Sequence, residues 1–167
     1  MGQRIEIRRA RHEDAQAMAD YTALMVAEKL DTILLDKPYS KEEEERMIAD
    51  YEAAGNVFLI ALDGARVVGM ADIKRGARTG NRHLCVLGMG VLSTYRGQGV
   101  GRRLLEAIIA EAKTLPGLCR MELGVTPWNT AAIGLYESVG FKLEGVKPKG
   151  VSLRGEPEDD LFMGLVW

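Results

Sequence analysis

The sequence has only two cysteines among its 167 residues, which excludes a disulfide framework. Both of them, Cys85 and Cys119, lie in apolar strand-like runs, so we expect reduced thiols in the core. There is no apolar run long enough to cross a membrane, and no signal-peptide layout at Met1. The formal net charge is −2 and the basic residues are scattered, which argues against nucleic-acid binding. We therefore expect a cytoplasmic protein that binds neither membranes nor nucleic acids.

The length and the 47% hydrophobic content suit one domain, residues 1–167, with a real core. No internal repeat or low-complexity block interrupts it. Alternating apolar positions predict strands at 4–8, 56–62, 66–74, 84–91, 119–125, 141–146 and 161–167. Helical spacing predicts helices from His12 to before Asp31, from Ser40 to about Ala54, from Gly101 to before Pro116, and over 130–139.

Local signals set several of these boundaries. Ser40-Lys41-Glu42-Glu43 is a capping box, and Asp63-Gly64 is typical of a hairpin turn. Residues 147–160, polar and interrupted by two prolines, predict a loop between the last two strands. A helical crossover joins strand 84–91 to strand 119–125, so these two strands should be parallel. The order β-α-α-β-β-β-α-β-α-β-β indicates an α/β protein.

The turn between strand 84–91 and the next helix carries three glycines at alternate positions: Gly97, Gly99 and Gly101. Glycine admits backbone conformations closed to other residues and lets a ligand approach the main chain. The first turn of a helix leaves unpaired N–H groups at the positive end of its dipole. Formal positive charge is added by Arg96, Arg102 and Arg103. The turn therefore predicts a binding site for a diphosphate.

The spacing of the glycines narrows the choice of phosphate ligand. No Lys-Ser or Lys-Thr pair follows them, which excludes a P-loop, and the spacing is wrong for a dinucleotide fingerprint. Residues 96–101 instead fit the pattern [QR]-x-x-G-x-[GA]. In its strand-turn-helix context this stretch resembles the acyl-CoA-binding signature of the GNAT superfamily of N-acetyltransferases. A nucleotide phosphate bound in a non-transferase fold remains an alternative.

A second stretch strengthens the resemblance. Residues 129–141 are similar to the family pattern N-x-x-A-x-x-[LF]-Y-x-x-x-G-F. The resemblance implies the GNAT acyl-CoA N-acyltransferase fold, a mixed and mostly antiparallel central sheet flanked by helices. In that fold the parallel strands 84–91 and 119–125 splay apart. It also implies acetyl-CoA as the donor and coenzyme A as a product.

The same resemblance assigns the residues that would hold acetyl-CoA. Backbone groups of Met89, Gly90 and Val91 would pair with the pantetheine arm. The pyrophosphate would lie on Arg96, Gly97, Gln98, Gly99, Val100, Gly101 and Arg102. Asn129 would make a polar contact near the thioester, and the Tyr136 hydroxyl would lie near the sulfur. We assign no metal site.

The implied reaction is direct attack of a primary amine on the thioester through a tetrahedral intermediate. An alkyl amine has a pKa of about 10.4, so at pH 7 only about one molecule in a few thousand is nucleophilic. Making the neutral form available costs roughly 4.6 kcal/mol unless the site assists. A main-chain N–H near residues 89–91 would stabilise the oxyanion. Tyr136 is our candidate acid for the departing thiolate, the alternative being a tyrosine that only packs its ring.

The sequence departs from the family pattern at the position that would supply the general base. Several members carry a glutamate on the strand before the glycine turn, where this chain has residues 85–87, Cys-Val-Leu. Glu122 on the following strand is our substitute, acting directly or through water, although its position also suits plain solvent exposure. Weaker options are Asp72, Glu28 and His83. A water relay without a dedicated base stays open.

The acceptor would meet the site at segment 30–39 and at loop 147–160. Acidic residues there favour a cationic amine: Asp31, Asp36, Glu156, Glu158, Asp159 and Asp160. We expect a small-molecule amine or an amino acid as acceptor. The alternatives are a protein or peptide amine, and a non-catalytic module that binds acyl-CoA for regulation. Exposed C-terminal edge strands with Phe162 and Trp167 suggest a homodimer.

Overall fold

The computed structural model describes residues 5–29, 35–153 and 155–167. Its strands are β1 (Glu6–Arg9), β2 (Val57–Asp63), β3 (Arg66–Arg75), β4 (Leu84–Val91), β5 (Arg120–Val125), β6 (Lys142–Val151) and β7 (Glu158–Val166). Its helices are α1 (Ala15–Ala27), α2 (Lys41–Ala53), α3 (Val100–Thr114) and α4 (Thr130–Ser138). Short 3-10 turns are η1 (His12–Asp14), η2 (Thr79–Asn81) and η3 (Ser93–Tyr95). None of the described helices has the length and apolar character of a membrane span.

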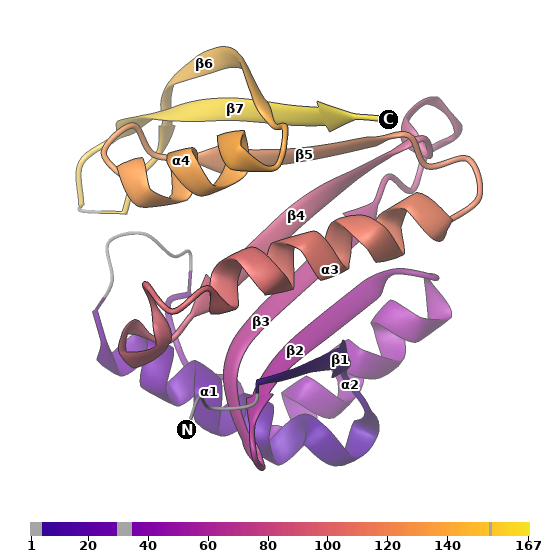
Figure 1. Ribbon diagram of the computed structural model, residues 1–167, viewed down its shortest axis with the longest axis vertical. Helices are drawn as coiled ribbons and strands as arrows, with labels where there is room; N and C mark the ends of the chain where they lie inside the picture. The colour runs from indigo at the N-terminus through magenta and orange to yellow at the C-terminus, as the bar shows by residue number, and fades with distance from the viewer. Residues whose placement is uncertain (1–4, 30–34, 154) are drawn as a thin grey trace.

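The strands form one seven-stranded sheet in the order β1-β2-β3-β4-β5-β7-β6 (Figure 1). Every neighbouring pair is antiparallel except β4 and β5, which are parallel as predicted. The pairing of β4 with β5 stops after three residue pairs, of which Val86 with Glu122 is the last. Beyond that point the two strands diverge, and the sheet opens into a V.

Helices cover the two faces of the sheet separately. α3 packs on one face, where Leu104 approaches Gly69 of β3. α2 covers the other face, where Tyr51 reaches Asp72, three residues further along β3. Since successive side chains of a strand point to opposite faces, residues 69 and 72 confirm that α2 and α3 lie on opposite sides. α4 lies in the C-terminal part of the fold near β5, β6 and β7 (Figure 1).

The predicted apolar stripe of α3 forms the centre of the core. Leu104, Leu105, Ile108 and Ala112 are fully buried, because they recur at the helical period on the side that faces β2 and β3. The capping box that begins α2 is confirmed. Ser40 Oγ accepts from the Glu43 N–H at 3.2 Å, and the Ser40 N–H donates to Glu43 Oε2 at 2.8 Å.

Two predictions from the sequence are wrong. Residues 147–160 are not one loop, because β6 runs to Val151 and β7 begins at Glu158. β6 is an edge strand, and an edge tolerates both proline and polar residues, so composition misled the prediction. Cys119 is exposed and Cys85 is buried, both as free thiols. Cys119 precedes β5, just after the turn at Pro116 and Gly117, and therefore lies outside the core.

An ion pair ties the first strand to the first helical turn. Both carboxylate oxygens of buried Asp14 accept from Arg8, at 2.7 and 2.8 Å, and the Arg11 N–H donates to Oδ2 at 2.7 Å. The hydrogen bond from Arg8 lowers the pKa of Asp14 below its ordinary value. The carboxylate therefore stabilises the fold above its unfolded pKa of about 3.9, and this contribution is lost as the pH falls through the lower folded pKa.

We expect Asp14→Asn to lower the free energy of unfolding by about 2 kcal/mol at pH 7, because it leaves the Arg8 guanidinium without its bidentate partner. The difference from the parent protein should shrink below about pH 4, where Asp14 becomes protonated. Urea unfolding at pH 7 and pH 3 measures both effects. Asp20→Asn on the exposed face of α1 is the control and should change little. A constant difference at both pH values would contradict the prediction.

Candidate active site

A cavity of about 790 Å³ lies in the opening between β4 and β5. β4 lines it from Val86 to Val91, and the first turn of α3 closes one end. The end of β5 and the inner side of α4 form the opposite wall, together with Gly150, Val151, Leu153 and Asp160. The cavity is therefore made by the sheet topology, since two strands that part leave a gap that no side chain of the core fills.

The glycine turn presents a row of unpaired donors to this cavity. Within the described residues, no N–H group from 97 to 102 donates to a backbone or side-chain acceptor, and the first helical bond comes from the Arg103 N–H. Gly97 and Gly99 have φ values of +70° and +80°, which place them in the left-handed region. A Cβ at either position would meet no atom within 4 Å. This cradle has the donors and the open space that a diphosphate requires.

Most side chains of the turn make hydrogen bonds within the protein, rather than the phosphate contacts that we predicted. Arg96 Nε donates to the Val91 carbonyl at 2.9 Å, and Arg96 Nη2 lies 3.6 Å from Glu28 Oε2. Arg103 donates to the Ile5 carbonyl at 2.8 Å, and Gln98 donates to the Thr94 carbonyl at 2.7 Å. The turn is thus braced by its own side chains, and its backbone is left to face the cavity.

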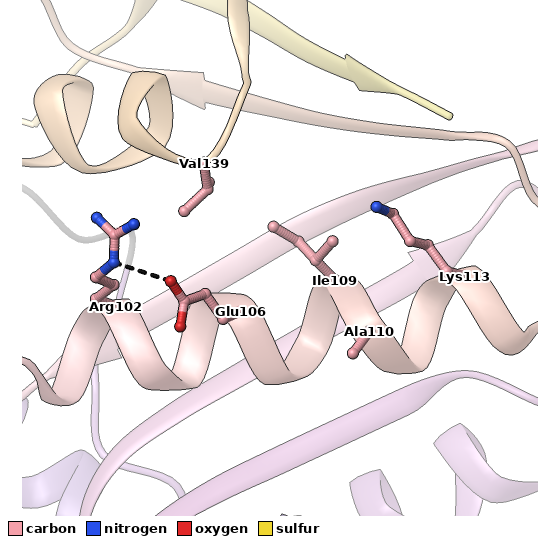
Figure 2. A pocket seen from close by; sticks show the side chains of 6 residues that line it. All are labelled: Arg102, Glu106, Ile109, Ala110, Lys113 and Val139. Carbon is pink, nitrogen blue, oxygen red and sulfur yellow. Dashed lines mark hydrogen bonds and ion pairs between the residues drawn. The ribbon is translucent and has the colours of Figure 1, made fainter.

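Arg102 lies at the border of this cavity and a second hollow along α3. Figure 2 shows that hollow, of about 360 Å³, with Glu106, Ile109, Ala110, Lys113 and Val139 around it. Arg102 Nε donates to Glu106 Oε1 at 2.8 Å, and Nη1 donates to Ser138 Oγ at 3.0 Å. Arg102 therefore links α3 to the end of α4 while keeping its charge beside the glycine turn.

β4 offers a free edge to the cavity. Met89, Gly90 and Val91 pair with β3 on one side, whereas the pairing with β5 has already stopped at Val86. Half of the main-chain N–H and C=O groups in this stretch therefore point into the gap, as on an edge strand. An extended ligand arm could pair with them as an added strand would.

α4 brings the two predicted residues of the second signature to the cavity wall. Asn129 is the N-cap of α4, and its Oδ1 accepts from the Ala132 N–H at 3.3 Å. Tyr136 lines the cavity, with its ring 5.7 Å from that of Phe141. Its hydroxyl makes no hydrogen bond with any residue that the structure describes, and burial raises the pKa of Tyr136 to about 12. It is a protonated donor with no partner of its own.

The proposed bases lie in different surroundings. Glu122 Oε1 accepts from Arg120 Nε at 2.6 Å, and Arg120 also pairs with Glu144. Glu122 is engaged by the Arg120 guanidinium, so its role as a base stays a prediction that this ion pair does not favour. Glu28 accepts from the N–H and the hydroxyl of Ser93, both at 2.8 Å. Exposed His83 precedes β4, away from the cavity.

The acidic residues predicted for the acceptor side are dispersed. Asp31 lies outside the described residues, and Asp36 and Glu156 are exposed. Glu158 accepts from Trp128 Nε1 at 2.8 Å, and Asp159 accepts from the Lys149 N–H at 3.0 Å. Only Asp160 lines the cavity.

From the sequence we did not single out the two carboxylates that lie over glycines of the diverging strands β4 and β5. Asp72 lies against Gly88 of β4, and Asp160 lies against Gly124 of β5. A glycine inside a strand often marks a close approach by another group. The glycines in these two strands were therefore a signal in the sequence that could have indicated the nearby carboxylates.

Comparison with known proteins agrees with this geometry. The family model described as "Acetyltransferase (GNAT) family" matches residues 24–141. N-alpha-acetyltransferase RimI of Mycobacterium tuberculosis is 35% identical over 100 residues, 60% of this chain and 61% of its own length. Peptidyl-lysine N-acetyltransferase YjaB of Salmonella typhimurium is 30% identical over 141 residues, 84% of this chain and 86% of its own length.

A solved structure is similar over nearly the whole chain. The structure of yncA, a putative acetyltransferase from Salmonella typhimurium with its cofactor acetyl-CoA, matches with a TM-score of 0.86 and 25% identity. The match covers 97% of this chain and 93% of that one. The arrangement of the seven strands and four helices is therefore that of a known fold, parting strands included.

Proposed function

Because the chain belongs to the acetyltransferase (GNAT) family, we propose that it transfers the acetyl group of acetyl-CoA to a primary amine. The observation that carries the proposal is the glycine cradle, whose N–H groups from 97 to 102 make no hydrogen bond within the described residues and whose glycines line a cavity that continues along β4. In acetyl-CoA a diphosphate joins the nucleotide to an extended arm that ends in the thioester. The cradle would hold the diphosphate, and the free edge of β4 would hold the arm. When bound, it supplies the activated acetyl thioester.

The residues of the chain then have distinct tasks. The cradle binds the diphosphate through main-chain donors, and the free edge of β4 orients the arm. A main-chain N–H of the stretch 89–91 stabilises charge that develops on the carbonyl oxygen. Tyr136 Oη holds the proton that ends on the departing sulfur. Neither a redox partner nor a metal is needed, since an N–C bond forms, a C–S bond breaks, and the nitrogen gives up one proton.

The acceptor is the finer part of the proposal. We propose a primary amine of a small molecule, because the cavity carries a carboxylate, Asp160, on its lining that would attract a cationic amine. RimI is named as an N-alpha-acetyltransferase and YjaB as a peptidyl-lysine N-acetyltransferase, so a protein amine is the second candidate. The chain spans about three fifths of the length of RimI, so its acceptor does not transfer from that name.

The test is release of free thiol from acetyl-CoA with a panel of amines, amino acids and peptides. We expect turnover with at least one small primary amine, and calorimetric binding of coenzyme A but not of ATP or NAD. Binding of coenzyme A without thiol release for any acceptor would favour the non-catalytic module. Failure to bind coenzyme A would contradict the proposal altogether.

A further inference from the structure

Two glycines mark the point at which the sheet opens. Val86 of β4 and Glu122 of β5 are the last paired residues, and Gly88 and Gly124 each lie two positions further on. Both glycines line the cavity. Residues two apart on a strand point to the same face, so Gly88 and Gly124 present the same face of the sheet across the gap.

Each glycine has a carboxylate over it, supplied by the outer neighbouring strand. Asp72 of β3 pairs with Gly88, and a Cβ at Gly88 would lie 2.8 Å from Asp72 Oδ1. A Cβ at Gly124 would lie 2.8 Å from both carboxylate oxygens of Asp160 on β7. A side chain at either glycine would displace the carboxylate. Asp160 lines the cavity itself, whereas Asp72 does not line it and stands over the lining residue Gly88, so the two carboxylates lie on the two sides of the gap.

The two carboxylates keep acceptor oxygens available. Tyr51 of α2 donates to Asp72 Oδ2 at 2.5 Å, and Oδ1 makes no hydrogen bond with a described residue. Asp160 forms no hydrogen bond or ion pair with any residue in the described ranges, although the alkyl stem of Lys147 lies close by, near Gly150. The Tyr51 contact also places both carboxylates on the face of the sheet opposite α3, away from the glycine cradle.

Of the nearby cations, Lys147 is the cross-strand neighbour of Asp160 but forms no ion pair with it within the described residues, and the other two are engaged elsewhere. Arg120 is held between Glu122 and Glu144. Lys74 lies over the Tyr51 ring, 5.4 Å from its centroid. Burial raises the pKa of Asp72, and the Tyr51 hydrogen bond and the Lys74 charge oppose that rise. A carboxyl group with an elevated pKa is a better proton acceptor at neutral pH than an ordinary aspartate.

We infer that Asp72 and Asp160 seat the ammonium group of the acceptor at the mouth of the gap, that Asp72 Oδ1 takes its proton, and that the pair selects amines without an adjacent carboxylate. The inference rests on the proposed acetyl transfer. Asp160 holds the cation from the β5 side, and Tyr51 holds the Asp72 carboxylate in place through its other oxygen. Asp72 is the catalytic residue, and Tyr51 is a positioning residue.

The protons balance in the proposed acetyl transfer. The acceptor arrives as R–NH3⁺, and Asp72 Oδ1 removes one proton, which frees the nitrogen lone pair. The N–C bond forms and the C–S bond breaks, Tyr136 gives its proton to the sulfur, and the second proton of the nitrogen restores the Tyr136 hydroxyl. Asp72 returns the first proton to water. The products are an N-acetyl amine, a thiol and one proton in solution.

The selectivity follows from like-charge repulsion. A free α-amino acid carries its carboxylate two bonds from the nitrogen, so seating the ammonium would bring a third negative charge against Asp72 and Asp160. The decarboxylated amine lacks that charge. Tyramine with tyrosine, and agmatine with arginine, are matched pairs that differ in this group alone.

The experiment compares the parent protein with Asp72→Asn and Asp160→Asn in the thiol-release assay. With the parent, we expect kcat/KM for each amine to exceed that of its amino acid at least tenfold. Asp72→Asn should lower kcat/KM for the amine at least about 100-fold at pH 7, and the loss should shrink towards pH 10, where solvent deprotonates the amine. Asp160→Asn should raise KM for the amine and reduce the preference over the amino acid.

Two further variants separate chemistry from folding. Asp63→Asn is the matched control, since Asp63 accepts from the Tyr95 hydroxyl at 2.8 Å outside the cavity, and its activity should stay unchanged. Tyr51→Phe should move the acidic limb of the kcat/KM profile to higher pH, because it removes a donor that lowers the pKa of Asp72. Each variant must bind coenzyme A as the parent does.

The outcomes are distinguishable. Parent turnover with an Asp72→Asn variant as active as the parent at pH 7 overturns this inference and leaves the acetyl transfer intact. An equal or better rate with the amino acids overturns the selectivity. A parent protein that releases no thiol with any amine overturns the proposed function, and this inference with it.

Discussion

Replacing Gly97 and Gly99 together by alanine will weaken binding of coenzyme A at least about 100-fold, which corresponds to about 2.7 kcal/mol. Both residues have positive φ values, a region that alanine avoids, so the turn will relax and its N–H groups will no longer converge. Hydrogen bonds from these donors to a charged phosphate are worth about 1.5–3 kcal/mol each. Titration calorimetry with coenzyme A measures the loss.

The matched control is the double variant Gly55→Ala and Gly64→Ala. These glycines also have positive φ values, +67° and +60°, with no atom within 4 Å of an added Cβ, and they lie outside the cavity lining. The control should lose comparable stability and keep its affinity. Pantetheine, which lacks the diphosphate, should bind both double variants equally. If the two double variants lost the same affinity for coenzyme A, the assignment of the cradle as a phosphate site would be contradicted.

Tyr136→Phe should lower kcat about 10- to 100-fold and change the dissociation constant of coenzyme A less than twofold. Burial raises the pKa of Tyr136 to about 12, so the hydroxyl stays protonated through the working pH range. A solvated thiol, with a pKa of about 8.5, would be a poor match for such a weak acid. The thiolate leaves inside the cavity rather than in water, and burial raises the pKa of a thiol, which narrows its difference from that of Tyr136.

Steady-state rates between pH 6 and pH 10 check this prediction. The control is Tyr95→Phe, since the Tyr95 hydroxyl donates to Asp63 and lines no part of the cavity. It should lose stability and keep kcat. If the Tyr136→Phe protein kept the kcat of the parent, the role of Tyr136 would be limited to packing its ring on Phe141.

The element order and the cradle could be predicted because both depend on neighbours in the sequence. The buried stripe of α3 repeats at the helical period, and the Ser40 capping box lies within four residues. The glycines at 97, 99 and 101 directly precede or begin α3. The parallel pairing of β4 and β5 followed from the crossover between them. Each of these signals is local, so a single chain without relatives carried it.

The candidate carboxylates could not be ranked from the sequence. Glu122 and Asp160 have the same charge, yet Glu122 is held by Arg120 and Asp160 stands over Gly124 at the cavity. Arg96 and Arg102 looked equivalent, but Arg96 braces the Val91 carbonyl while Arg102 joins α3 to α4. Whether a charged group is used or already paired depends on partners that lie far away in the chain.

The sequence by itself determined that this protein is an α/β chain with an anion cradle at the start of α3, because periodicity and turn chemistry act over a few residues. Only the tertiary structure decided where β4 and β5 part, and that Asp72 and Asp160 flank that point. Register and strand order bring residue 72 to residue 88 on one side of the gap, and residue 160 to residue 124 on the other. No local pattern encodes such a meeting, since it is produced by the packing of the whole sheet.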